Sequence, residues 1–176
     1  MKKITFDLDI YSYQIDFTGQ VNNAVYINWM EIGRAKLFDA VGLPISTLVS
    51  QGSIPALAST TIAYKTPLFQ GDRVWIEMWL SAVGYTSTVM RFNFYNAGCD
   101  TENLRDQVLT AEGYQRSMFV DKDTLKSKRF TRQEKDAFLP YLEEQPLEKI
   151  NLLPKSPRFR AAVNRSPLVP AELSNK

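Results

Sequence analysis

The sequence of 176 residues contains no histidine, and this absence narrows the possible chemistry more than any other feature of the composition. Without an imidazole, the chain cannot form a Ser-His-Asp or Cys-His nucleophilic site, and it has no histidine to act as a general base. Most zinc sites are excluded as well, because a single cysteine cannot replace the missing ligands. Proton or acyl transfer would therefore depend on a carboxylate, a lysine, a tyrosine or the backbone.

Cysteine and long apolar runs are also scarce. Cys99 is the only cysteine, so no internal disulfide can form, which is typical of a reducing compartment. It lies in a polar, turn-rich segment with no histidine to activate it, and we expect a spectator thiol. No apolar run approaches the ~20 residues that a membrane span needs. The N-terminal segment MKKITFDLDI lacks the apolar core of a signal peptide. These features together predict a soluble, cytoplasmic protein.

An excess of charge of one sign is missing too. The formal net charge is +2, and the lysines and arginines are scattered rather than gathered on one run. A modest basic cluster at residues 122–132 is interrupted by acidic residues and is typical of a solvated loop. A nucleic-acid partner is therefore not expected.

The apolar residues, 44% of the chain, follow patterns that predict one helix and several strands. Residues 3–13 alternate between apolar and polar side chains, as in a half-buried strand, and residues 14–23 form a polar loop. From Ala24 the period becomes helical for about five turns at ~3.6 residues each. Gly42 and Pro44 provide the expected stop. Few polar residues interrupt this helix, so we expect it to be enclosed on most sides.

The segment after this helix reads as a series of strands joined by short loops, which favours antiparallel pairing. The expected strands cover residues 54–66, 73–83, 85–95 and 107–120. The last has no cleanly apolar face, and Gly113 suggests a bulge or bend in it. The sequence thus predicts an α+β domain over residues 1–121, with one long helix against a curved antiparallel sheet of about five strands.

Residues 122–176 form a C-terminal extension of different character. Thr131–Glu134 (TRQE) has the pattern of a capping box and predicts a short helix that ends before Pro140. From residue 143 onward, prolines recur among mixed polar residues. We interpret this part as an extended or partly disordered arm that docks on a surface of its own or a neighbouring subunit.

One loop, residues 14–26 (QIDFTGQVNNAVY), brings a carboxylate close to the start of the predicted helix. Asp16 follows the first strand, Gly19 permits a tight backbone path, and the helix N-terminus supplies unpaired N–H groups. Such donors can hold a developing oxyanion, and the carboxylate can attack an acyl carbon or activate water. The alternative is a turn, helix-cap or solvated-loop role, although Asp16 lies about six residues before the helix, which is far for a cap.

The same loop resembles the acyl-CoA thioesterases of the hotdog fold, specifically the 4-hydroxybenzoyl-CoA thioesterase group. The pattern of that group is an Asp, two variable residues, Gly, usually His, then Val-Asn-Asn and an aromatic-rich helix with a Glu and an Arg. A second signature of the group is matched in IAYKTPLFQGDRVWIE. The matching residues are Asp16, Gly19, Val21, Asn22, Asn23, Tyr26, Trp29, Glu31, Arg34, Tyr64, Pro67, Gly71 and Asp72. The resemblance covers about residues 4–121.

This resemblance implies a hotdog fold, in which the curved sheet wraps a long central helix, and hydrolysis of an acyl-CoA or acyl carrier protein thioester without a metal or cofactor. Asp16 would be the catalytic nucleophile or general base, and the backbone N–H of Asn23 the main oxyanion donor. Gly19, Asn22 and Tyr26 would contact the substrate. The resemblance also implies a homodimer or homotetramer with its sites at the subunit interface.

Two residues depart from the family pattern. Gln14 stands where the family often has another Asp, and Gln20 stands where it usually has His. The carboxylate and the backbone donors remain, but Gln20 takes away a supporting donor or acid. A non-catalytic protein that binds acyl thioesters is therefore the alternative function. A hotdog hydratase or dehydratase is not expected, because those sites use His together with a carboxylate.

Four further residues carry open interpretations. Glu31 lies three residues before Arg34, so an ion pair explains it, and support of the site by positioning water is the alternative. Asn22 could cap the helix or orient Asp16. Lys65 and Arg91 are candidate contacts for the phosphates of CoA by charge alone.

Overall fold

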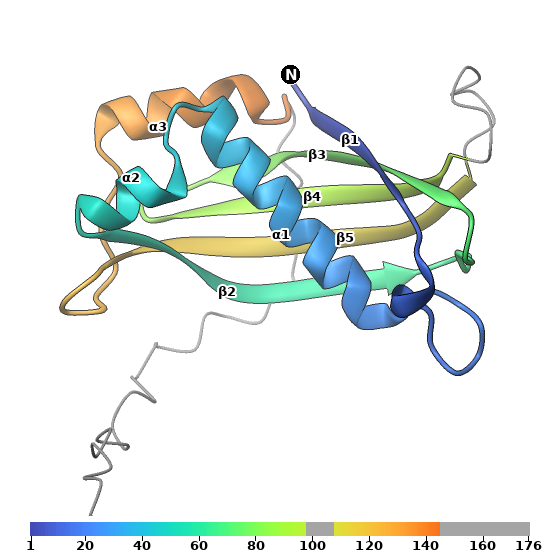
Figure 1. Cartoon of the computed structure of the whole chain (residues 1–176). Helices are drawn as coiled ribbons and strands as arrows, with labels where there is room; N and C mark the ends of the chain where they lie inside the picture. The colour runs from blue at the N-terminus through green and yellow to red at the C-terminus, as the bar shows by residue number, and fades with distance from the viewer. Residues whose placement is uncertain (98–107, 145–176) are drawn as a thin grey trace, which may run out of the picture.

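The computed structural model describes residues 1–97 and 108–144, which form a five-stranded antiparallel sheet in the order β1-β3-β4-β5-β2 with helices against it (Figure 1). The predicted α+β arrangement with five antiparallel strands is confirmed. The strands are β1 (Ile4–Asp9), β2 (Ser53–Tyr64), β3 (Arg73–Val83), β4 (Ser87–Asn96) and β5 (Val108–Asp121). The helices are α1 (Asn23–Ala40), α2 (Ile45–Ser50) and α3 (Arg132–Phe138), with single 3-10 turns η1 (Ser12–Gln14) and η3 (Leu139–Tyr141).

Helix α1 spans 18 residues and lies across one face of the sheet (Figure 1). It ends as the sequence predicts, because Gly42 adopts a φ of +72° and its N–H donates to the carbonyl of Asp39. The N–H of Leu43 donates to the carbonyl of Phe38, which completes a Schellman motif. At Gly33 the helix comes close to the sheet, since a Cβ there would lie 2.8 Å from the Phe92 ring.

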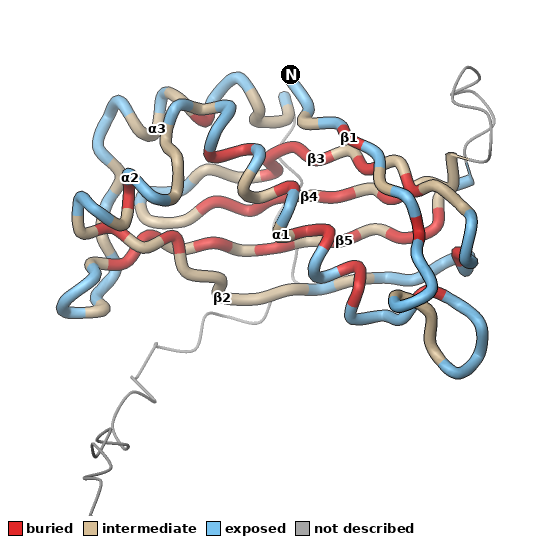
Figure 2. The backbone as a smooth tube through the Cα atoms, in the orientation of Figure 1, coloured by how far each residue is buried: buried red, intermediate tan, exposed pale blue. Residues whose placement is uncertain are grey.

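The core lies between α1 and the middle strands, where buried segments of both elements face each other (Figure 2). Alternate residues of the central strands point toward the helix and are completely buried. They are Val74, Ile76, Met78 and Leu80 on β3 and Met90, Phe92 and Phe94 on β4. The alternation of these fully buried residues explains the period-two pattern that predicted the two strands.

Of the bulge or bend expected at Gly113, the bulge is not there, and that part of the prediction is wrong. Gly113 pairs in register with Phe92 on one side and Ile62 on the other. The glycine makes room for the helix instead, because a Cβ at this position would lie 2.9 Å from the Cε of Met30. The first strand is also shorter than expected, since β1 ends at Asp9 and η1 follows.

The segment after β5 packs on the same core up to residue 144. Thr131 and Glu134 form the predicted capping box at the start of α3. Phe138 at its end is buried against Phe38 and Phe130, with ring centroids 6.1 and 5.6 Å apart. The N–H of Glu143 then donates to the carbonyl of Leu80 on β3 (2.8 Å). Cys99 and residues 145–176 of the predicted arm, which was expected to begin at residue 143, lie outside the described residues. The domain boundary at residue 121 stays a prediction.

Candidate active site

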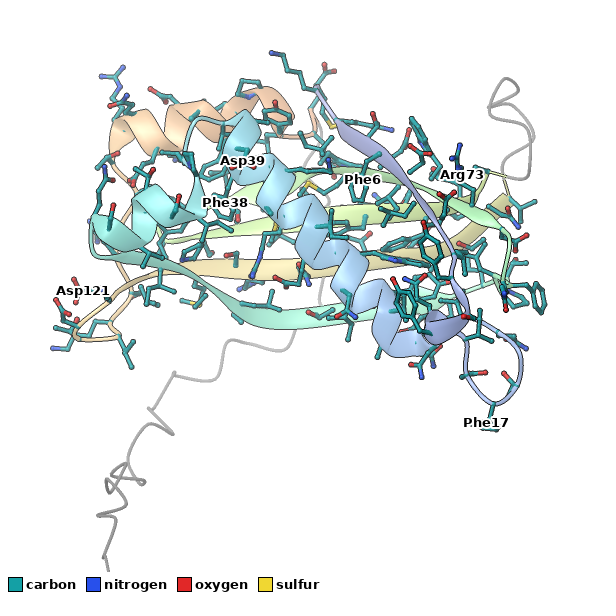
Figure 3. All side chains as sticks on the ribbon, viewed as in Figure 1. Phe6, Phe17, Phe38, Asp39, Arg73 and Asp121 are labelled. Atoms are coloured by element: carbon teal, nitrogen blue, oxygen red, sulfur yellow. The ribbon has the colours of Figure 1, made fainter. Side chains whose placement is uncertain are left out.

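The loop between β1 and α1 is a small hairpin that fixes the position of Asp16. Ile15 and Val21 form a bridge between its two sides, and the N–H of Asp16 donates to the carbonyl of Gln20 (2.8 Å). The N–H of Gly19 donates back to the carbonyl of Asp16 (3.0 Å), and Gly19 has a φ of +81°, which residues with a Cβ rarely adopt. Phe17, next to Asp16, marks the tip of this loop (Figure 3).

The carboxylate of Asp16 is held by the residue two positions along the chain. Its Oδ1 accepts hydrogen bonds from the Thr18 hydroxyl (2.5 Å) and from the Thr18 backbone N–H (2.7 Å). These two bonds stabilise the ionised form and lower the pKa of Asp16 below its ordinary value, with the hydroxyl as the larger cause. A backbone hydrogen bond of Gln20 lowers the pKa of Asp16 further. Asp16 is therefore charged at neutral pH.

The N-terminus of α1 leaves one backbone donor without a partner. Asn22 is the N-cap, since its side chain accepts from the N–H of Ala24 (2.9 Å) and its carbonyl accepts from the N–H of Val25 (2.9 Å). The cap role of Asn22, one of the two left open, is thus observed. In the described parts of the chain, the N–H of Asn23 has no hydrogen-bond acceptor, and it lies at the positive end of the helix dipole.

An open pocket of about 170 Å³ lies beside this helix end. Two segments line it, one at the start of α1 and one at the end of β2, and the N–H of Val21 links them by donating to the carbonyl of Leu68 (2.9 Å). The lining residues are Gln20, Val21, Asn23, Tyr26, Tyr64, Lys65, Thr66 and Pro67. Asp16, Gly19 and Asn22 are outside this lining and belong to the adjoining loop. Asn23 is therefore one of the residues that a substrate in the pocket would meet.

Tyr26 is a buried residue of the pocket lining and is not suited to act as a base. Burial raises the pKa of Tyr26 to about 12, although a hydrogen bond with Thr110 partly opposes this rise. The phenol therefore stays neutral at physiological pH. Its ring packs edge-on against the rings of Tyr64 and Phe94, with centroids 5.2 Å away in both cases.

Tyr64 is a pocket residue that was predicted only as part of a family signature and not as a member of the site. Its hydroxyl donates to the carbonyl of Asn23 (3.0 Å), which joins the end of β2 to the first turn of α1. Thr66 and Pro67 were also not predicted to line the pocket. The available signal was the position of all three residues at the end of a predicted strand, but their proximity to the helix start depends on the strand register.

The other candidate residues are placed differently. Glu31 pairs with Arg34 on α1, as the simpler interpretation predicted, two turns away from Asn23. Arg91 lies over the rings of Trp79 (5.2 Å) and Tyr114 (5.5 Å), on the sheet face that points away from α1. Lys65 lines the pocket and contacts Glu112 (3.2 Å). Of the two candidate phosphate contacts, only Lys65 is therefore at the pocket.

No group of three or more described Cys, Asp and Glu side chains could hold a metal ion. No helix in the same residues has the length and apolar character needed to cross a membrane.

A model of the thioesterase-like superfamily matches residues 12–175. The chain belongs to this superfamily. It is 25% identical over 126 residues to YneP of Bacillus subtilis, a candidate acyl-CoA thioesterase, which covers 72% of this chain and 86% of YneP. It is 31% identical over 77 residues to the acyl-acyl carrier protein thioesterase ATL2 of Arabidopsis thaliana, which covers 44% of this chain and 41% of ATL2.

Solved structures of thioesterases share the fold. The DHNA-CoA thioesterase of Staphylococcus aureus matches with a TM-score of 0.70 and 17% identity, over 80% of this chain and 91% of that protein. A mutant of 4-hydroxybenzoyl-CoA thioesterase, complexed with 4-hydroxybenzoyl-CoA, matches with a TM-score of 0.69 and 19% identity, over 78% and 99% of the two chains. Together with the superfamily match, these structures confirm the predicted resemblance to hotdog thioesterases.

Proposed function

We propose that the protein hydrolyses the thioester of an acyl-CoA or of an acyl carrier protein, with Asp16 as the catalytic carboxylate and the backbone N–H of Asn23 as the oxyanion donor. The observation that carries this proposal is that the N–H of Asn23 has no acceptor among the described residues, while Asn23 itself lines a pocket next to the loop of an ionised carboxylate. Acyl transfer requires both groups, one to stabilise the developing negative charge and one to supply or activate the nucleophile.

In the proposed mechanism, the thioester carbonyl enters the pocket and its oxygen accepts a hydrogen bond from Asn23. Asp16 then acts in one of two ways. It attacks the carbonyl carbon, so that the carbon–sulfur bond breaks, the thiolate leaves and water cleaves the mixed anhydride. Alternatively, it removes a proton from a water that attacks the same carbon, and the proton passes to the departing thiolate. The lowered pKa of Asp16 supplies the charged form that either route needs.

The two routes differ in where oxygen from water first appears. We suggest a single turnover in ¹⁸O-labelled water with enzyme in excess over substrate, followed by mass spectrometry of the peptide that contains Asp16. Attack by the carboxylate, followed by attack of water on the Asp16 carbonyl of the mixed anhydride, places the label in Asp16 and leaves the first acid product unlabelled. Label in Asp16 therefore identifies the nucleophilic route, whereas label in the acid product alone results from general-base catalysis or from attack of water on the acyl carbonyl of the anhydride.

Several finer assignments belong to the same proposal. Tyr26 would form a wall beside the acyl group, while Gly19 and Asn22 would shape the approach to Asn23. Lys65 at the rim would contact phosphates of the carrier. Helix α1 would be the central helix of the hotdog fold, in a cytoplasmic homodimer or homotetramer. The name of ATL2 supports an acyl carrier protein substrate, and the name given to YneP supports acyl-CoA.

The test is a hydrolysis screen with purified protein over aryl, short, medium and long acyl groups, each presented on CoA and on acyl carrier protein. Release of the free thiol reports turnover, and titration calorimetry with the same thioesters reports binding. Turnover of at least one class supports the proposal. Binding without turnover across the whole panel would favour the alternative, a non-catalytic protein that binds acyl thioesters.

A further inference from the structure

The hydroxyl of Tyr64 makes a contact that neither the helix nor the strand needs for its own geometry. It donates to the carbonyl of Asn23 (3.0 Å), across 41 positions of sequence. In a regular helix this carbonyl already accepts the N–H four residues later. The bond is present although Tyr64 is 46% exposed, so that water could bond to the same hydroxyl instead. An additional bond at this carbonyl restrains the first turn of α1.

The end of β2 that carries Tyr64 is firmly attached. Tyr64 pairs with Ala111 on β5, and the backbone N–H groups of Lys65 and Thr66 both donate to the carbonyl of Thr110 (2.8 and 3.2 Å). The hydroxyl of Thr110, which is fully buried, donates to the carbonyl of Phe94 (3.1 Å). Tyr64 is therefore carried by a strand end that is hydrogen-bonded to fully buried residues of β5.

The ring of Tyr64 is held from the helix side as well. It packs edge-on against Tyr26, with ring centroids 5.2 Å apart. Because Tyr26 is one turn along α1 from Asn23, the ring and the hydroxyl of Tyr64 contact successive parts of the same helix end. Loss of the hydroxyl alone would keep this ring contact and remove only the restraint on Asn23.

We propose that Tyr64 is a positioning residue, which holds Asn23 so that its N–H stays directed at the thioester carbonyl oxygen. This inference rests on the proposed function, because it assigns Tyr64 to the oxyanion donor of that site. The donor N–H and the restrained carbonyl lie in the two peptide units that meet at the Cα of Asn23, so a bond at the carbonyl restrains the N–H through the φ and ψ angles of this one residue. Oxyanion stabilisation depends on donors that are already aligned before the reaction. Small misplacements of such a group lower the rate strongly.

The contribution of a positioning residue has a characteristic kinetic form. A hydrogen bond to the carbonyl oxygen strengthens as negative charge develops on it, so a misaligned donor affects the transition state more than the bound substrate. Replacement of Tyr64 by Phe should therefore lower kcat and leave KM nearly unchanged. A residue that only binds substrate would instead change KM, and a residue that only supports the fold would change neither at temperatures well below unfolding.

The experiment compares Tyr64→Phe with Tyr95→Phe, using whichever thioester the wild type hydrolyses. Tyr95 is the matched control, because its hydroxyl also takes part in a hydrogen bond (Asn93 Nδ2, 2.9 Å) and it is not among the residues that line the pocket. We expect Tyr64→Phe to reduce kcat by about tenfold or more with KM within about twofold of wild type. Tyr95→Phe should leave both constants within about twofold. An unchanged kcat for Tyr64→Phe, or an effect confined to KM, would overturn the inference.

A second measurement does not depend on turnover. In ¹⁵N-labelled protein, Tyr64→Phe should shift the amide resonance of Asn23 and accelerate its hydrogen exchange, while the amide of Thr18 stays unchanged. If Asn23 is unaffected, the positioning role is wrong even in an active enzyme. If the wild type hydrolyses no thioester, the proposed function fails, and the amide measurement still decides whether Tyr64 restrains Asn23.

Discussion

Two turns at opposite ends of the molecule hold an aspartate in nearly the same way (Figure 3). At Asp16, one carboxylate oxygen accepts the hydroxyl and backbone N–H of Thr18. At Asp121, one oxygen accepts the backbone N–H (2.8 Å) and the hydroxyl (2.7 Å) of Thr124. The pKa of both carboxyl groups is lowered by these bonds, with the Thr18 hydroxyl the largest cause at Asp16 and the Thr124 N–H at Asp121.

The surroundings of the two carboxylates differ. Backbone bonds close both turns: the N–H of Asp121 donates to the carbonyl of Lys126 (2.8 Å) and its carbonyl accepts from the N–H of Leu125 (2.9 Å), as the N–H and carbonyl of Asp16 do within their own hairpin. Only the turn at Asp16 leads to the start of α1, where a pocket lies and where the N–H of Asn23 has no acceptor among the described residues. A threonine-bound carboxylate with a lowered pKa is therefore a common turn device, and the neighbouring backbone donor is what distinguishes the candidate site.

The largest expected effect comes from neutralising each aspartate in turn. Asp16→Asn should lower kcat for thioester hydrolysis by about 10²- to 10⁴-fold, because it removes the nucleophile or base and keeps the shape of the side chain. Asp121→Asn should leave kcat within about twofold, since its carboxylate only closes a turn. Steady-state kinetics on the best substrate from the screen measures both. Equal losses in the two variants, or a fully active Asp16→Asn, would contradict the assignment.

The second test compares the N-termini of α1 and α3. Asn22→Ala and Thr131→Ala each remove a side chain that accepts a backbone N–H, and each should cost about 1 kcal/mol of unfolding free energy in urea titrations. Only Asn22→Ala should also lower kcat, because it loosens the turn that presents Asn23. A loss of kcat in Thr131→Ala of the same size would show that general stability, and not the α1 terminus, governs activity.

The smallest expected effect is a change in pH dependence. Asp16 must be ionised to act, so kcat/KM should fall only at acid pH, below the ordinary range of an aspartate, because its pKa is lowered. Thr18→Ala removes the largest cause of the lowering, so the pKa rises and the acidic limb moves to higher pH. Thr124→Ala should not move it, and a shift of similar size in that variant would contradict the role of Asp16.

The lowered pKa of Asp16 and Asp121 also determines how their contribution to folding stability depends on pH. An aspartate with a lowered pKa in the folded state stabilises the fold above its unfolded pKa, and this contribution is lost as the pH falls through the folded pKa. For both Asp16 and Asp121, this window lies below their ordinary pKa of 3.8. In acid unfolding curves, Thr18→Ala and Thr124→Ala should therefore both reduce this contribution to the free energy of unfolding. Only Thr18→Ala should also change the pH profile of activity.

Local patterns predicted most of the elements, because each depends on neighbours in sequence. The end of α1 at Gly42 and the capping box at Thr131 are examples, since a glycine with positive φ and a threonine cap act within a few residues. The hairpin that contains Asp16 is likewise formed by residues that are close together in sequence. Gly113 was misinterpreted because its reason is a contact with Met30, far away in sequence.

The pocket could be predicted only in part for a similar reason. Asn23 and Tyr26 belong to a helix whose start is visible in the sequence. The contact of Tyr64 with Asn23 requires the pairing of Tyr64 with Ala111 and the angle at which α1 crosses the sheet. Neither the strand pairing nor the crossing angle is encoded in a short stretch of residues. The family signature therefore identified Tyr64 but not its contact with Asn23.

The close approach of α1 to the sheet at Gly33 has a consequence for variation elsewhere in the molecule. A helix is stiff, and about ten residues at 1.5 Å each separate Gly33 from Asn23, a lever arm of about 15 Å. A methyl group at Gly33 would lie 2.8 Å from the Phe92 ring, so that either the ring or the helix would have to shift. Where the helix shifts, the direction of the Asn23 N–H changes with it. Substitutions under the helix could then change turnover by the proposed site without changing any residue of the pocket.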